Sequence, residues 1–204
     1  VVTLKKSGIT DIEQIKGKKI SSGSPGSGTN FMSETVFKAL GIPLDSYNDS
    51  RLSFTETANA LRDGTIDVGF WSVGPGTSSI LDLATTHDIH IISFTPEQQK
   101  KIQAANEEYS AVDLAGGVYR GVDNSVPTIG VWNVMICQKS LNTDLVYNLV
   151  KALFEHQDYL LKIHPSASYT TAENAVKYSP IPLHPGTVKY LKEKGIEVPA
   201  GLMP

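Results

Sequence analysis

The residues best suited to chemistry in this sequence lie in a short loop rich in glycine and serine. Residues 23–29, Gly-Ser-Pro-Gly-Ser-Gly-Thr, have the glycine spacing of a phosphate-binding P-loop but lack the lysine that this motif requires. At a helix start, unpaired backbone N–H groups, the helix dipole and hydroxyl groups together attract an anion such as a carboxylate. The candidate contacts are Ser24, Gly26, Ser27, Gly28 and Thr29. A strand-to-helix turn without a ligand would show the same pattern.

A second loop of similar composition occupies residues 72–76, between an expected strand at 66–71 and an expected helix from about Thr77 to Thr86. Ligands of α/β sheets bind at the carboxyl ends of the strands, so both loops are expected at one edge of one sheet. Trp71 offers an apolar wall or an N–H donor, and a core aromatic residue is the alternative. The candidate contacts here are Trp71, Ser72, Val73 and Gly74.

No arrangement of residues for catalysis or metal binding accompanies the two loops. Neither Ser24 nor Ser27 has the Gly-x-Ser-x-Gly context of a hydrolase nucleophile, and the GxGxxG dinucleotide fingerprint is absent. His87 and His90 lack the further ligands of a zinc motif. Asp67 is isolated in an apolar strand rather than half of an acid/base pair. We therefore expect no catalytic residue, no metal and no cofactor.

Composition narrows the possible partners. The 204 residues are 40% hydrophobic and 19% charged, which is typical of a compact globular protein. A net charge of -3 provides no basic field for nucleic acid or an anionic membrane surface. No apolar run approaches the ~20 residues needed to cross a bilayer, so we expect no membrane insertion. Cys137 stands in an apolar run and is expected to be a buried thiol.

Strands and helices alternate through the first two thirds of the chain, which predicts a mostly parallel sheet flanked by helices. The first loop joins a strand at 19–22 to a helix at 30–40, and capping-box spacing begins further helices at Ser53 and Thr95. A long apolar strand is expected at residues 128–138. Asn142 then precedes one helix with an apolar stripe that reaches Ile163.

Taken together, the motifs resemble the TAXI solute receptors of TRAP transporters, which are bacterial periplasmic binding proteins. The resemblance covers almost the whole chain and is specific in order and spacing. It rests on residues 7–9, 15–20, 23–29, 60–64, 66–70, 126–133 and 182–186.

This resemblance implies a two-lobed periplasmic-binding-protein-like fold of type II, with hinge closure on a ligand in the cleft. The ligand would be a small carboxylate such as glutamate, glutamine or a dicarboxylate, and the partners would be TRAP membrane permease subunits. The second loop departs from the family pattern, with Gly74-Pro75-Gly76 in place of a Gly-Ala-Pro type run.

The resemblance to TAXI receptors also implies a division of the chain and a location in the cell. Residues 1–4 would be a hinge-crossing strand, residues 5–127 the second lobe, and residues 128–204 the return hinge strand with the C-terminal part of the first lobe. Family members carry a signal peptide and a leading segment of the first lobe. We therefore expect a periplasmic or extracytoplasmic protein whose first lobe is incomplete here.

Two other function classes remain open from the residues alone. The effector-binding domain of a bacterial transcription regulator has a similar length and two-lobed build, and an upstream helix-turn-helix would identify it. A phosphate-ester enzyme could use the first loop to hold phosphate, but it needs a nucleophile, base or metal set near the loops.

Overall fold

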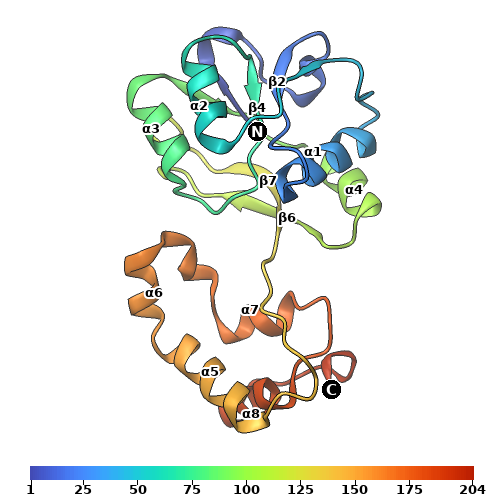
Figure 1. Cartoon of the computed structure of the whole chain (residues 1–204), viewed down its shortest axis with the longest axis vertical. Helices are drawn as coiled ribbons and strands as arrows, with labels where there is room; N and C mark the ends of the chain where they lie inside the picture. Colours follow the sequence, from blue (N-terminus) through green and yellow to red (C-terminus); the bar gives the residue numbers. More distant parts are fainter. The chain divides into compact units, whose positions relative to one another are not determined.

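The computed structural model describes residues 1–204, which divide into two compact units, Val1–Val131 and Trp132–Pro204 (Figure 1). The first unit contains every strand of the chain, and the second is built from helices and connecting segments. Both loops that were singled out from the sequence belong to the first unit. No helix of the structure has the length and apolar character that a membrane span requires.

A five-stranded sheet forms the centre of the first unit, in the order β3-β2-β4-β1-β5. Its strands are β1 (Val2–Leu4), β2 (Lys19–Ser21), β3 (Asn48–Asp49), β4 (Val68–Gly69) and β5 (Ile89–Ile91). Strand β2 pairs in parallel with β3 and β4, whereas β1 runs antiparallel to β4 and β5. The prediction of a mainly parallel sheet is therefore confirmed, with β1 as the exception.

Helices cover both faces of this sheet (Figure 1). They are α1 (Gly28–Ala39), α2 (Phe54–Arg62), α3 (Ser78–Thr86) and α4 (Pro96–Ala105), with short 3-10 turns η1 (Lys5–Ser7) and η2 (Ile12–Ile15). Helices α1 and α4 pack together on one face, and α2 and α3 pack together on the other. The core of the first face includes Phe37, and that of the second includes Leu61 and Leu83.

Local capping interactions fix where the helices begin. The side chain of Ser53 accepts from the N–H of Glu56, whose carboxylate accepts in turn from Ser53. Thr95 and Gln98 form the same reciprocal pair at the start of α4, directly before Pro96. Both capping boxes that the sequence predicted are thus present, because each depends only on residues three positions apart.

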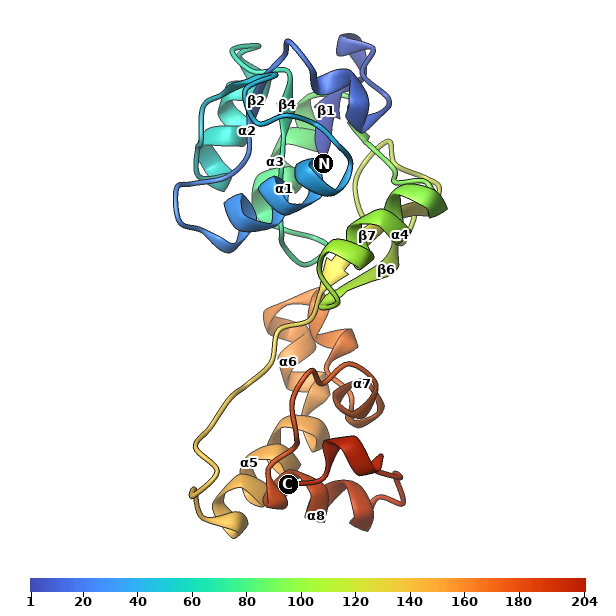
Figure 2. The same cartoon turned by 90° about the vertical axis from the view of Figure 1, so that its right-hand side faces the viewer.

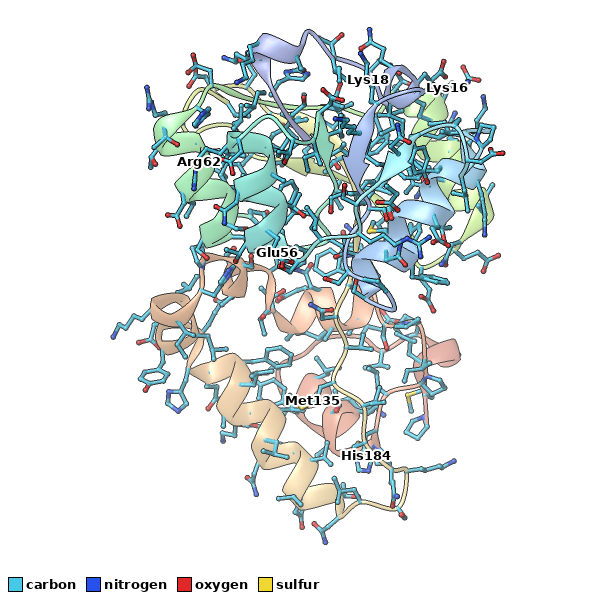
Figure 3. The ribbon with its side chains drawn as sticks, turned by 45° about the horizontal axis from the view of Figure 1, so that its top comes forward. Lys16, Lys18, Glu56, Arg62, Met135 and His184 are labelled. Carbon is cyan, nitrogen blue, oxygen red and sulfur yellow. The ribbon has the colours of Figure 1, made fainter.

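A two-stranded hairpin of β6 (Tyr109–Leu114) and β7 (Val126–Val131) completes the first unit. The expected strand at residues 128–138 is wrong beyond Val131, because Tyr109, the first residue of β6, already pairs with Val131. The connection after β7 therefore has no neighbouring strand to bond with (Figure 2). Met135 on this segment is 80% exposed (Figure 3), and Cys137 is exposed rather than buried.

The second unit is a group of short helices. They are α5 (Thr143–Glu155), α6 (Gln157–Ile163), α7 (Ala172–Lys177) and α8 (Pro185–Glu193), with 3-10 turns η3 (Pro165–Tyr169) and η4 (Ala200–Leu202). Helices α5 and α8 pack together through Val146 and Tyr190. The single helix expected from Asn142 to Ile163 is interrupted at His156. Its apolar stripe remains exposed at Leu145 and Leu149, because no sheet in this unit covers it.

Candidate functional site

The two glycine-rich loops meet at one edge of the sheet. Strands β2 and β4 are parallel neighbours, with Ser21 opposite Gly69, so the chain leaves both strands at the same edge. The loops are also linked directly, because the N–H of Ser72 donates to the Oγ1 of Thr29 at 3.4 Å. The structure thus brings together two segments that are more than forty residues apart in sequence, as the sequence predicted.

The first turn presents unpaired donors at the start of α1. Ser27 is the residue before the helix, and its Oγ accepts from the N–H of Asn30 at 3.1 Å. The N–H groups of Gly26 and Gly28 have no acceptor in the protein, and both residues are exposed. Because the dipole of α1 places partial positive charge at this end, the turn can attract an anion from solvent. The hydroxyl hydrogen of Ser27 remains available to a ligand, since only its oxygen is used in the cap.

Glycine is required at the beginning of this turn. Gly23 has φ +101°, and a Cβ there would lie 2.8 Å from the Cγ2 of Thr29 and 3.0 Å from the backbone nitrogen of Asn30. The first residue of the turn therefore packs directly on the first turn of α1. Thr29 is buried by this arrangement, whereas Ser24 and Ser27 are half-buried.

A polar network behind the turn fixes its position. The backbone N–H and the hydroxyl of Ser22 both donate to the carboxylate of Asp49, at the end of β3. The side-chain amide of Asn30 donates to the Oγ of Ser22 at 3.0 Å and to Glu34 at 3.3 Å. Arg51 closes the network, with its Nε 3.3 Å from Asp49 and its Nη2 3.8 Å from Glu34.

Sequence reasoning missed this network. Its members come from the residue after β2, from β3, from α1 and from the segment after β3, so only the sheet order brings them together. The sequence pattern predicts no strand at Asn48–Asp49 and so gives no signal for the position of Asp49. Arg51 has φ +48°, the only positive value outside glycine, and no sequence pattern indicates it.

The second loop differs from the first because a neighbouring side chain already occupies the N–H donors at the start of the helix that follows it. The hydroxyl of Tyr119, from the β6–β7 connection, accepts from the N–H of Gly76 at 3.1 Å and from that of Thr77. Burial raises the pKa of this hydroxyl, so it stays neutral at physiological pH. Thr77 does not cap α3, since its hydroxyl donates to the carbonyl of Gly74 at 2.8 Å. The candidate contacts Ser72, Val73 and Gly74 are half-buried beside this arrangement.

Trp71, directly before the second loop, contributes an unsatisfied donor. Its ring lies against Gly69 and is only 8% exposed. The indole Nε1 is buried and has no acceptor in the protein. Leaving such a donor unpaired costs about 1–3 kcal/mol, so a buried N–H of this kind is a place where a ligand atom or water would be stabilising. Trp71 thus belongs to the core and keeps a free N–H, and its contact with a ligand stays a prediction.

No catalytic arrangement surrounds the turn. The ring nitrogens of His87, His164 and His184 bond to a neighbouring threonine or to backbone groups far along the chain from Ser24 and Ser27. No group of three or more histidine, cysteine, aspartate or glutamate residues is placed to hold a metal ion. What the site offers is hydrogen-bond donation to an anion.

Comparison with known protein families agrees with a binding role. The sequence model of the NMT1-like family matches residues 1–195. The chain belongs to this family. The NMT1-like family is a periplasmic-binding-protein-like family of solute-binding proteins, and it is a binding family rather than an enzymatic one. Its members are usually extracytoplasmic.

Membership in the NMT1-like family confirms the broader part of what the sequence resemblance implied, namely a solute-binding protein with a periplasmic-binding-protein-like α/β fold. A small-molecule ligand follows from the same membership. The narrower assignment to TAXI receptors stays a prediction.

Proposed function

We propose that the first unit captures the carboxylate of a small solute at the start of α1. The observation that carries this proposal is the pair of exposed N–H groups of Gly26 and Gly28, which have no acceptor in the protein and lie at the positive end of a helix. The hydroxyl of Ser27 supplies a third donor. A carboxylate with two oxygens can accept all three bonds without displacing any group of the protein.

The biological setting that fits this capture is delivery of a solute to a TRAP transporter, as in TAXI receptors. In this proposal the protein works outside the cytoplasm and docks on the membrane permease subunits of the transporter. Residues 5–127 act as the lobe that carries the turn, and residues 1–4 and 128–138 act as the crossings of a hinge. Support for this setting comes from the membership in the NMT1-like family and from the sequence motifs, which resemble those of TAXI receptors.

Calorimetric titration of the purified chain with amino acids, dicarboxylates and monocarboxylates tests the proposal. Ser27→Ala or Thr29→Ala is expected to weaken binding of the best ligand by roughly 1–3 kcal/mol, as for hydrogen bonds lost to a charged group. Thr29 contributes through its link to Ser72 as well as through its own hydroxyl.

Ser53→Ala is the matched control, since it removes the N-cap of α2 in the same unit. Both serine variants should lose about 0.5–2 kcal/mol of unfolding free energy with their caps, but only Ser27→Ala should lose affinity. Unchanged affinity in Ser27→Ala and Thr29→Ala would exclude the first turn as the binding site.

A further inference from the structure

An exposed aromatic ring lies beside the unpaired donors of the first turn. Phe31, in the first turn of α1, is 64% exposed, whereas Met32, Val36 and Phe37 of the same helix are buried in the core. Phe31 fits the helical spacing of these core residues in the sequence. It faces solvent instead, because it stands on the side of α1 opposite the sheet.

The direction of helical side chains places this ring near the donors. In an α-helix each side chain leans toward the N-terminus and covers the surface over the preceding turn. The surface N-terminal to Phe31 is that of Ser27 and Gly28, where the N–H of Gly28 is free, whereas that of Ser27 donates to the carbonyl of Ser24. A molecule whose carboxylate bonded to these donors would therefore have its next few atoms against the phenyl ring.

Charges beside the turn act against a second carboxylate on the ligand. Glu34 and Asp49 carry two negative charges, and Arg51 is the one cation that contacts them. The same imbalance affects Tyr47, where burial together with Asp49 and Glu34 raises the hydroxyl pKa to about 12, against the smaller opposite effect of Arg51. The guanidinium of Arg51 is thus engaged by protein carboxylates, and the surroundings carry excess negative charge.

We infer that the ligand is a monocarboxylate with an apolar body, whose carboxylate bonds to the N–H groups of Gly26 and Gly28 and whose hydrocarbon part packs on Phe31. This inference rests on the proposed function and narrows its ligand class. A second charge on a short dicarboxylate would be unfavourable on the phenyl ring or beside Glu34 and Asp49, and a charge that stayed in water would leave the ring uncovered. An apolar body instead removes the ring of Phe31 from water.

Three probes of similar size separate the contribution of the carboxylate from that of the apolar body in calorimetric titrations of the full chain. Phenylacetate carries both features, glutarate has a second carboxylate in place of the apolar body, and phenylacetamide keeps the apolar body without the charge. Phenylacetate is expected to bind at least about tenfold more tightly than either of the others. Phe31→Ala is expected to weaken phenylacetate binding by roughly tenfold, and Phe31→Leu should retain most of the affinity.

Leu44→Ala provides the control for loss of an exposed apolar side chain elsewhere in the unit, since Leu44 is 39% exposed. It should leave every affinity unchanged. If glutarate binds as tightly as phenylacetate, or if Phe31→Ala has no effect on phenylacetate binding, packing of the ligand on Phe31 is excluded. Loss of glutarate binding in Ser27→Ala would then still support capture of carboxylates by the turn. Binding of neither carboxylate would overturn both the inference and the proposed function.

Discussion

Replacing Gly23 by alanine is expected to abolish capture of carboxylates and to lower the unfolding free energy of the first unit by about 3 kcal/mol. Two costs combine at this position. The backbone has φ +101°, where an L side chain is strained, and the new Cβ would lie within 3.0 Å of Thr29 and of the backbone nitrogen of Asn30. Relief requires a movement of the first turn of α1, which carries the donors.

Gly17→Ala separates these costs, because Gly17 has φ +76° but no atom within 4 Å of the position that the new methyl group would take. Its variant should lose only the conformational part, about 1–2 kcal/mol, and should bind ligand normally. Unfolding in denaturant can be followed through Trp71 alone in a Trp132→Phe background, since these are the two tryptophans of the chain. Equal losses in both glycine variants would show that the turn is not tightly packed on α1.

A second large effect is expected in the other unit from Gly186→Ala, which should lower its unfolding free energy by about 3 kcal/mol. A Cβ at this position would collide with the carbonyl oxygen of Thr143 and would lie 2.7 Å from the backbone nitrogen of Tyr147. Both are backbone atoms of α5, so no side-chain rotation relieves the clash. Helices α5 and α8 would have to separate.

His184 adds to the effect of this substitution, because it anchors the same end of α8 (Figure 3). Its Nδ1 accepts from the N–H of Gly186 at 3.1 Å, so its Nε2 carries the hydrogen and donates to the carbonyl of Leu141 at 3.1 Å. Moving Gly186 weakens both bonds. Trp132 in a Trp71→Phe background reports on this unit, and Gly201→Ala, with open space around it, is the control. A loss below about 0.5 kcal/mol in Gly186→Ala would contradict the close approach of the two helices.

The parts of the fold that sequence predicted well depend on residues close together in the chain. The capping boxes at Ser53 and Thr95 were visible because each pairs positions three residues apart. The two loops were placed at one sheet edge because parallel strands share a direction, and the link from Ser72 to Thr29 confirms that placement.

The parts that sequence reasoning missed depend on distant partners. Residues 132–138 have the composition of a strand. Val131 already pairs with Tyr109, the first residue of β6, so β6 offers no partner to later residues and the strand ends at Val131. Phe31 fits the helical spacing of the core and yet lies outside it. The hydroxyl of Tyr119 accepts from the N–H of Gly76, 43 positions away in the sequence, and only the folded chain brings the two together.

Amide chemical shifts of Gly26 and Gly28 test the central claim most directly. In a titration of the ¹⁵N-labelled chain with the carboxylate that binds best in calorimetry, both amide signals should move and saturate with the calorimetric affinity, since both N–H groups gain an acceptor. The matching neutral amide should leave them in place. If the carboxylate binds while both glycine signals stay fixed and others move, the ligand is held elsewhere and the account of the first turn is wrong.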